Sequence, residues 1–499
     1  NHYQTAYEIF TERGPLAVLP SPNSKEKSST FIYSTKDNLS DGAIYKLIKK
    51  NFSLSHGVIK FNKEVNHFSI SPHISKDLSN RYFLIGDTLR SIHPVAGQGW
   101  NLGVKDIQTL SSLLNMMSIT KTIPDGFQDY YDEEKYVKSQ LYLKDKTKLG
   151  LFSSILSLIL ILVVIQFGLF GKLDEFVRSS STHSITSGLI FFGILFIVND
   201  IINLPFSIYG TFVIEEKYGF NKTTVQTFIS DKLKGYGLTI VLGSLVIVPV
   251  LYFFDRYGDN GWWIAWSLIT AFMIAIQPLF VHVIAPMFNK FTPLEEGELR
   301  TAIEEFAGKV NFPIGRIDVM DGSRRSAHSN AYFSGFGKSR RIALFDTLLD
   351  KHTTEEIVSV VAHEVGHYKK KDVITGTVLG ILETGLMLYI FNYFMSDQAL
   401  FDVFGVKEVS VYCGLVLFGM LYSPVSLITS ILTTAMSRKN EFEADAYALE
   451  TTNKEEPLIS MLKGLAASNL SHLTPHPLMV FLSYIHPPVL ERISAVRSS

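Results

Sequence analysis

The chain has 499 residues, of which 46% are hydrophobic and 19% are charged, and its mean hydropathy is +0.19. Because soluble proteins carry about a quarter charged residues and disordered chains are polar, this composition excludes disorder and indicates a membrane protein with soluble parts. The net charge of −1 predicts no nucleic-acid partner, and the single cysteine, Cys413, excludes an intramolecular disulfide and a cysteine-rich zinc site.

Residues 1–119 form a first, mixed segment, which we predict to be α/β. Their sequence resembles the C-terminal part of a ubiquinone-biosynthesis flavin hydroxylase, and the stretch 82–106 carries the most specific part of the match. In that family a Gly-Asp pair contacts the ribityl–pyrophosphate part of FAD, and a glycine-rich helix start lies against the isoalloxazine ring, where free N–H groups favour negative charge. The resemblance implies cofactor contacts at Gly86, Asp87, His93, Pro94, Gly97 and Gly99.

The same segment lacks the half of a flavoprotein that binds ADP. No Gly-x-Gly-x-x-Gly motif occurs in the sequence, and the βαβ unit that would surround it is absent. We therefore predict that this chain does not hold FAD, and that it joins parts of two proteins near residues 116–122. A FAD-dependent aromatic-ring hydroxylase is kept as a second hypothesis, which requires the missing half to be supplied upstream or by another chain.

Six long apolar stretches follow, and we predict each of them to be a transmembrane helix. Each is close to the about 18–20 residues that a helix needs to cross a hydrocarbon core of about 30 Å. A buried core helix could reach this length once, but six such stretches indicate a mainly α-helical, polytopic membrane protein. The stretches are 150–170, 185–212, 236–254, 262–288, 373–395 and 409–435.

The basic residues are distributed unevenly between the loops. One set of loops holds only four Lys and Arg residues and comprises 171–184, 255–261 and 396–408. The other set holds 23 and comprises 213–235, 289–372 and 436–499. Because loops rich in Lys and Arg stay in the cytoplasm, we predict that both termini and the charged segments lie on the cytoplasmic side.

A zinc-binding pattern occurs in the charged segment 355–371, where His363 and His367 flank Glu364 within a helical apolar spacing. Two histidines at i and i+4 lie on one helix face, so their ring nitrogens can converge on one tetrahedral Zn²⁺. Glu364 is adjacent to the first histidine and can accept a proton from water at the metal. The alternative interpretation is an exposed histidine pair on an ordinary surface helix.

A third ligand is predicted in segment 438–450. Glu441 and Asp445 are four residues apart and share a helix face, whereas Glu443 points to the opposite side. We assign Glu441 to the metal and Asp445 to a hydrogen bond with the free N–H of a zinc histidine. The alternative is a solvated acidic face, which the interleaved apolar residues disfavour.

Over residues 121–499 the sequence resembles the type I CAAX prenyl endopeptidases, which are integral-membrane zinc metalloproteases. The matching segments occur in family order and are 204–209, 212–221, 284–294, 325–336, 342–348, 363–367, 441–448 and 483–493. The resemblance implies membrane helices around a large chamber, a zincin-type catalytic domain, one Zn²⁺ per chain, and a peptide or protein substrate that can carry a lipid. Family members have a further N-terminal membrane helix, in whose place this chain has residues 1–119.

The resemblance also implies roles for individual residues. Zinc would be held by His363, His367 and Glu441, with Glu364 as the base. His486 would face the scissile carbonyl and stabilise its oxyanion, with Arg492 close by, although a histidine before two prolines is by itself also typical of a turn. Asn330 and His328 would contact substrate, and segment 327–345 is predicted to be a hairpin whose edge pairs with an extended peptide.

The sequence thus predicts an N-terminal fragment at 1–119, a membrane domain at 120–288, and a zinc peptidase domain at 289–499 that includes two further membrane helices. The predicted function is an integral-membrane zinc endopeptidase surrounded by lipid. A catalytically inactive scaffold with the same fold is a third hypothesis, which is disfavoured because every expected catalytic position is filled.

Overall fold

The computed structural model describes residues 98–120, 122–181, 183–334 and 341–498, together with short parts of the N-terminal segment. These parts are residues 7–11, 14–20, 29–33, 35, 39–56, 59–61, 73–74 and 90–91. The positions Gly86, Asp87, His93, Pro94 and Gly97, for which FAD contacts are implied, lie outside the described residues. Gly99 lies in the first turn of helix α2 (Gln98–Met117).

The described parts of the N-terminal segment form a small α/β unit. Strands β1 (Tyr7–Thr11), β2 (Gly14–Pro20) and β3 (Ser29–Tyr33) make an antiparallel sheet in that order. Helix α1 (Asp41–His56) packs on it, and the shared core consists of Leu16, Val18, Ile44, Ile48 and Phe52. Strands β4 (His73–Ile74) and β5 (Arg90–Ser91) form a separate antiparallel pair.

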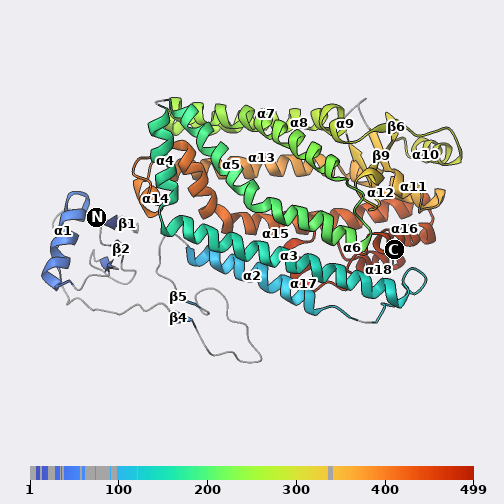
Figure 1. Ribbon diagram of the computed structural model, residues 1–499, viewed down its shortest axis with the longest axis horizontal. Coiled ribbons are helices and arrows are strands. Elements are labelled where there is room, and N and C mark those ends of the chain that lie inside the picture. The colour runs from blue at the N-terminus through green and yellow to red at the C-terminus, as the bar shows by residue number, and fades with distance from the viewer. Residues whose placement is uncertain are drawn as a thin grey trace.

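The apolar stretches fold into long helices that run side by side along the molecule (Figure 1). They are α3 (Glu133–Gln166), α5 (Ser184–Tyr209), α7 (Val225–Tyr257), α8 (Gly261–Leu279), α13 (Asp372–Met395) and α15 (Val411–Thr452). Among the residues that the structure describes, five segments qualify as membrane spans by length and hydropathy. One of them, the 64-residue segment Val225–Phe288, contains both α7 and α8. These two helices turn at Gly258, which has a φ of 50°, and pack against each other. The six predicted stretches therefore correspond to six helices.

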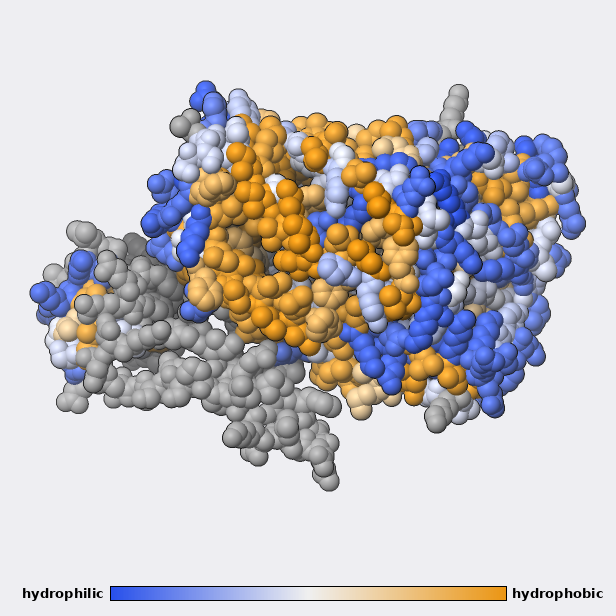
Figure 2. Space-filling view, viewed as in Figure 1, coloured by the Kyte–Doolittle hydropathy of each residue, from blue (hydrophilic) through white to orange (hydrophobic). Residues whose placement is uncertain are grey.

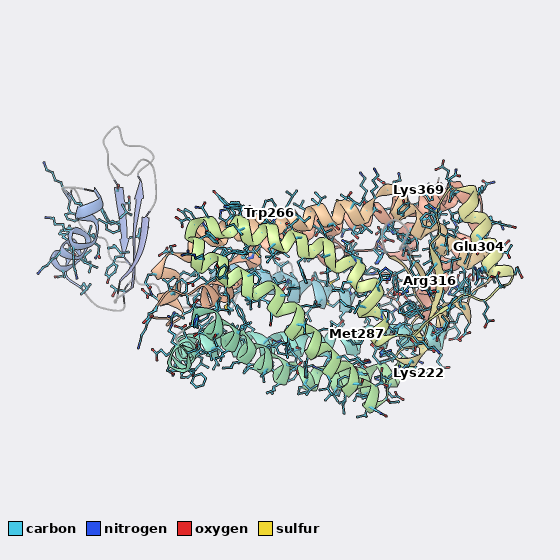
Figure 3. All side chains as sticks on the ribbon, turned by 90° about the horizontal axis from the view of Figure 1, so that it is seen from above. Lys222, Trp266, Met287, Glu304, Arg316 and Lys369 are labelled. Atoms are coloured by element: carbon cyan, nitrogen blue, oxygen red, sulfur yellow. The ribbon has the colours of Figure 1, made fainter. Side chains whose placement is uncertain are left out.

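The outer faces of these helices expose large apolar side chains. Ile201, Leu233, Ile240 and Leu432 are each 62–65% exposed, which in water would mark an extensive interaction surface. Figure 2 shows a hydrophobic surface over the membrane helices and a hydrophilic surface over the end that contains α10, α16 and α18. Viewed from above, Trp266 lies in the apolar part, whereas Lys369 and Glu304 lie in the hydrophilic end (Figure 3). This division fits a membrane part and a water-exposed domain.

Shorter elements connect the membrane helices. They are α4 (Leu169–Ser180), the π-helix η2 (Gly210–Glu215), α6 (Glu216–Tyr218), the 3-10 helix η3 (Gly258–Asn260), the π-helix η4 (Phe280–Ile284), α9 (Ala285–Phe288) and α14 (Gln398–Val403). Each π-helix follows a proline inside the preceding helix, Pro205 or Pro278. A proline removes a helical hydrogen bond, which favours such a local change of helix type.

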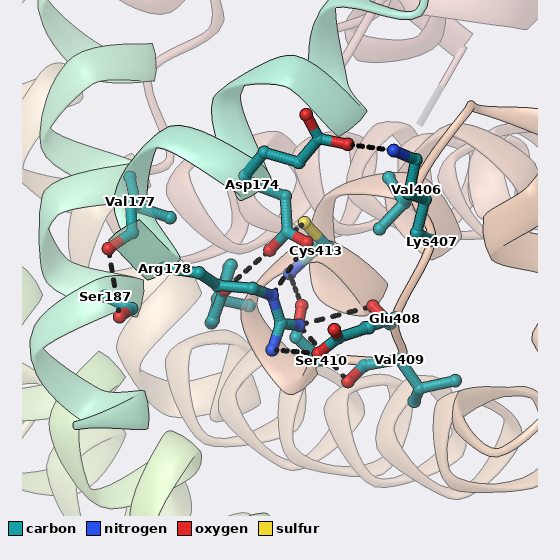
Figure 4. Close-up of polar contacts among 12 residues, drawn as sticks. Asp174, Val177, Arg178, Ser187, Val406, Lys407, Glu408, Val409, Ser410 and Cys413 are labelled. Carbon is teal, nitrogen blue, oxygen red and sulfur yellow. Dashed lines mark hydrogen bonds and ion pairs between the residues drawn. The ribbon is translucent and has the colours of Figure 1, made fainter. Parts of the chain in front are cut away.

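The end of the bundle away from the hydrophilic domain is closed by a buried polar network (Figure 4). Asp174 of α4 accepts a hydrogen bond of 2.5 Å from the Tyr412 hydroxyl and one of 2.8 Å from Arg178 Nε. Arg178 in turn pairs with Glu408 at 3.1 Å. Cys413 lies in the same buried network, with its Sγ 3.6 Å from Asp174 Oδ1. The single cysteine therefore belongs to a set of polar contacts that connect α4 with the start of α15.

The hydrophilic domain contains a four-stranded mixed sheet with the order β6-β7-β9-β8. The strands are β6 (Phe291–Pro293), β7 (Arg316–Met320), β8 (Ala331–Ser334) and β9 (Arg341–Phe345). The antiparallel pairing of β8 with β9 confirms the predicted hairpin, whose turn lies outside the described residues. The helical elements of the hydrophilic domain are α10 (Glu298–Lys309), η5 (Gly322–Arg324), α11 (Asp346–Leu349), α12 (Thr354–Lys370), α16 (Glu455–Ser468), α17 (Pro477–Ser483) and α18 (Val489–Ser498).

Helix α2 runs along the membrane helices, beside α3 and α15, and its C-terminal end reaches α17 (Figure 1). Strand β1 of the N-terminal segment contacts α14. The side of the membrane on which each terminus lies stays a prediction.

Candidate metal centre

Helix α12 places the two predicted zinc histidines at the boundary between its buried and accessible faces. A reciprocal capping box between Thr353 and Glu356 starts the helix. Its buried face carries Val361 and Val365, which anchor it in the domain core. His363 and His367 then lie one turn apart, and their Nε2 atoms are 3.1 Å from each other. The Nε2 atoms of the two histidines therefore converge on one point.

The third group comes from α15, which crosses α12 at close range. A side chain on Gly366 would place its Cβ only 3.0 Å from Cα of Ala444, which is tighter than an ordinary van der Waals contact, so the absence of a side chain favours this close crossing. Glu441 Oε2 lies 3.5 Å from His363 Nε2, and Glu441 Oε1 lies 3.4 Å from His367 Nε2. One ligand atom from each of the three residues lies within 4.8 Å of the others. Two imidazoles and one carboxylate are a usual ligand set of catalytic zinc sites.

The predicted carboxylate segment is the last part of a single 42-residue helix, α15, which also contains the apolar stretch 409–435. Glu441 is 4% exposed and faces the histidines. Glu443 faces away, lies 36% exposed, and pairs with Lys370 at 3.5 Å. The side chains are therefore arranged as the helical spacing predicts, with Glu441 rather than Glu443 toward the cluster.

Each histidine is held through its other ring nitrogen. Asp445 Oδ1 lies 2.9 Å from His363 Nδ1, which is the hydrogen bond that the sequence predicts. Asp372 Oδ2 lies 2.7 Å from His367 Nδ1, a contact that the sequence analysis missed. Asp372 begins α13 directly after Lys371, whose φ of 62° makes the sharp turn between α12 and α13. Such carboxylates fix the ring orientation and leave Nε2 free to bind a metal.

The site favours positive charge. Burial acts to lower the pKa of His363, but the hydrogen bonds that it donates to Asp445 and Glu441 outweigh this and raise the pKa to about 9. The pKa of His367 is raised as well, because the hydrogen bonds with Glu441 and Asp372 overcome its desolvation. Three carboxylates thus surround two imidazoles, and a divalent cation would compensate their charge. The residues present fit a zinc ion.

Arg492 and His486 approach the cluster from the C-terminal end of the chain. Arg492 makes a bidentate pair with Asp445, at 2.7 and 2.6 Å, and its Nη1 lies 3.2 Å from Glu441 Oε2. His486 Nδ1 lies 2.8 Å from Glu441 Oε1, and the His486 side chain is 60% exposed. The structure therefore brings both residues to the cluster, Arg492 beneath the ligands and His486 at the rim.

Glu364 lies beside the cluster, in the wall of a cavity of about 480 Å³. Desolvation raises the pKa of its carboxyl group above the ordinary value, despite the two neighbouring histidines and a hydrogen bond from the backbone of Phe333 in β8. A carboxylate with a raised pKa is suited to accept and return a proton near neutral pH. The cavity is lined by Phe333, Glu364, His367, Asp372, Val373, Gly376, Leu379, Gly380, Glu383, Thr433, Met436, Ser437 and Asn440.

The predicted substrate residues lie in the loop before β8. His328 stacks on Phe220 with ring centroids 3.8 Å apart, and its Nδ1 lies 3.2 Å from Asn469 Oδ1. Its Nε2 lies 3.5 Å from Glu215 Oε2. These contacts of His328 are with neighbouring elements and not with the metal cluster. The Asn330 side chain accepts a hydrogen bond from the backbone of Ala331. Substrate contact by His328 and Asn330 stays a prediction.

Comparison with known proteins agrees with this architecture. Residues 113–290 match the family described as "CAAX prenyl protease N-terminal, five membrane helices", and residues 293–499 match "Peptidase family M48". Residues 20–143 match a family described as "FAD binding domain", which overlaps the start of the peptidase match.

Similar proteins span nearly the whole peptidase. CAAX prenyl protease 1 of Saccharomyces cerevisiae is 34% identical over 406 residues, which cover 76% of this chain and 89% of that protein. The human CAAX prenyl protease 1 homolog is 30% identical over 425 residues, with 76% and 89% covered. The crystal structure of S. mikatae Ste24p superposes with a TM-score of 0.74 at 34% identity and covers 80% of this chain and 97% of that chain. The chain therefore belongs to the CAAX prenyl protease family of M48 integral-membrane metallopeptidases.

Proposed function

We propose that the chain is a zinc-dependent endopeptidase in which His363, His367 and Glu441 hold one zinc ion. The observation that carries this proposal is the convergence of the three ligand atoms within 4.8 Å, beside Glu364 in the cavity wall. When bound, zinc supplies Lewis-acid chemistry that activates water and polarises the scissile carbonyl.

The surrounding residues perform the proton transfers and hold the substrate. Glu364 accepts a proton from the attacking water and returns it to the leaving amine. His486, exposed at the rim, donates a hydrogen bond to the oxyanion that develops on the scissile carbonyl. Arg492 holds Asp445 and thereby the ring of His363. The free edge of β8, whose Phe333 N–H reaches Glu364, is suited to pair with an extended peptide.

We propose that the peptide substrate carries a prenyl chain. The cavity extends from Glu364 along α13 and α15, two helices that are apolar enough to cross a membrane. Apolar side chains such as Val373, Leu379 and Met436 line it. A peptide held at β8 could therefore extend a lipid between these helices. The relatives described above are named as CAAX prenyl proteases, which supports the same substrate class.

Purified protein is expected to contain one zinc ion per chain and to cleave a prenylated CAAX peptide. Removal of the metal with a chelator is expected to abolish cleavage, and added zinc is expected to restore it, because the ligands remain in place. Zinc analysis and the cleavage rate before and after chelation measure this. Cleavage that persists in protein shown to be free of metal would contradict the proposal.

We also propose that the chain does not hold FAD. The sequence lacks the glycine-rich turn that binds the pyrophosphate, and α2, which contains Gly99 in its first turn, packs on the peptidase. The absorption spectrum of the same zinc-containing preparation, after incubation with FAD, is the measurement. Stoichiometric flavin in the gel-filtered protein would instead support the hydroxylase hypothesis.

We propose that the metal centre and the C-terminus face the cytoplasm. Lys369, Lys370 and Lys371 directly precede α13 and mark the membrane boundary, because ammonium groups are costly in hydrocarbon. Loops at this end are also the ones rich in basic residues.

Cysteine labelling in intact cells is expected to show this orientation. In a Cys413→Ser background, Lys370→Cys is expected to resist an impermeant thiol reagent until the membrane is permeabilised. Lys407→Cys, whose wild-type side chain is 80% exposed at the opposite end of the bundle, is the matched control and is expected to react from outside. The reverse pattern would contradict the orientation.

A further inference from the structure

Helix α2 comes from the part of the chain that resembles a flavoprotein, but its contacts are with the peptidase. Residues 20–143 match the FAD binding domain family, and α2 (Gln98–Met117) lies inside that match. In the structure α2 lies against α3, α15 and α17 (Figure 1).

The face of α2 that meets the peptidase contains two buried polar side chains. Ser111 is 1% exposed and Asn115 is 4% exposed, whereas Lys105 and Gln108, which are nearer the N-terminal end of α2, are exposed. A buried amide must find hydrogen-bond partners, because leaving it unpaired is costly. The Ser111 hydroxyl donates a hydrogen bond to the carbonyl of Gln108 in its own helix, and it also contacts the sulfur of Met479 in α17. Asn115 finds its partners in another segment.

The partners of Asn115 belong to the segment that leads to His486. Its Oδ1 accepts a hydrogen bond of 3.0 Å from the backbone N–H of His476, the residue that caps α17. Its side chain also interacts with Tyr484, the first residue after α17. Asn115 therefore holds both ends of the seven-residue helix α17.

The same segment is fixed from the other side by α15. Arg438 Nη1 donates to the carbonyl of Val480 at 2.9 Å and to that of Tyr484 at 2.7 Å. His486 follows two residues after Tyr484 and reaches Glu441 at 2.8 Å. Pro487 and Pro488 restrict the backbone immediately beyond it. The position of His486 is therefore set by the anchors on residues 476–484, one from α15 and one from α2.

We propose that Asn115 is a positioning residue of the peptidase, which holds α17 and Tyr484 so that His486 faces the metal site. Asn115 lies where the match to the FAD binding domain family, residues 20–143, overlaps the match to the N-terminal family of the peptidase, residues 113–290. This inference rests on the proposed role of His486.

Asn115→Leu is expected to lower kcat about tenfold with KM and zinc content nearly unchanged, because small displacements of an oxyanion donor are costly. Gln108→Leu makes the same amide-to-alkyl change at an exposed position of α2 and is expected to keep the wild-type kcat. Tyr484→Phe removes one of the two Asn115 contacts without leaving a cavity and is expected to lower kcat in the same direction by about threefold. It also tests the proposal if the leucine variant fails to fold.

A double-mutant cycle separates positioning from general destabilisation. In a His486→Ala background, Asn115→Leu and Tyr484→Phe are expected to cause no further loss of kcat, because the residue that they position is gone. Equal losses with and without His486, an increase in KM in place of a loss of kcat, or wild-type activity of both variants would overturn the inference. If His486→Ala itself retains wild-type kcat, the proposed role of His486 fails first. If His486→Ala is impaired and the Asn115 variants are not, only the inference fails.

Discussion

Glu364→Gln is expected to lower kcat by about 10²- to 10⁴-fold while one zinc ion per chain remains bound. Glutamine has the shape of glutamate and can still accept the hydrogen bond from the Phe333 backbone, so the cavity wall is expected to keep its geometry. The ligands His363, His367 and Glu441 are untouched. What is lost is the group that accepts the proton of the attacking water. Zinc content and kcat for a prenylated peptide are the two measurements.

The control for this substitution lies on the same helix. Glu355→Gln removes an equal charge, but Glu355 is exposed and pairs with Lys454 at 2.6 Å. Surface pairs of this kind contribute little, so the control is expected to retain kcat and stability. A Glu364→Gln variant that cleaves at the wild-type rate would show that another group is the base.

Glu441→Ala is expected to abolish zinc binding and activity, whereas Glu443→Ala is expected to stay within about twofold of the wild type. Glu441 is buried and supplies the carboxylate of the cluster, so its removal deletes one ligand. It also leaves Arg492 and His486 without the oxygen atoms that they contact. Glu443 loses only partly exposed pairs with Lys370 and Lys439.

Zinc content, kcat and the thermal unfolding midpoint distinguish the two variants. Glu441→Ala is expected to lower the midpoint as well, because a buried arginine would then lack part of its counter-charge. Restoring the carboxylate on the same helix by Glu441→Asp is expected to recover part of the zinc affinity. If Glu443→Ala were the severe variant, the third ligand would have been assigned to the wrong carboxylate.

The arrangement of the metal centre depends on both local and long-range features. The spacing of His363 and His367, and that of Glu441 and Asp445, follows from the helical period and could be predicted from the sequence. Asp372 could not be predicted, because its approach to His367 depends on the left-handed turn at Lys371. The bidentate contact of Arg492 with Asp445 joins residues 47 positions apart, and no local pattern indicates it.

The sequence by itself determined the features that repeat along one helix or strand: six apolar stretches long enough to cross a membrane, the β8–β9 hairpin, and the faces of α12 and α15 that carry the ligands. Such periodicity is a local property of the sequence. It can be recognised because the burial of one face of a helix or strand requires apolar residues at a regular spacing. Only the tertiary structure decided where α2 lies. Its sequence resembles a flavoprotein helix and carries exposed charge, yet Ser111 and Asn115 are buried against α17. Packing between segments 360 residues apart depends on the shape of both partners, and one-dimensional patterns do not encode that shape.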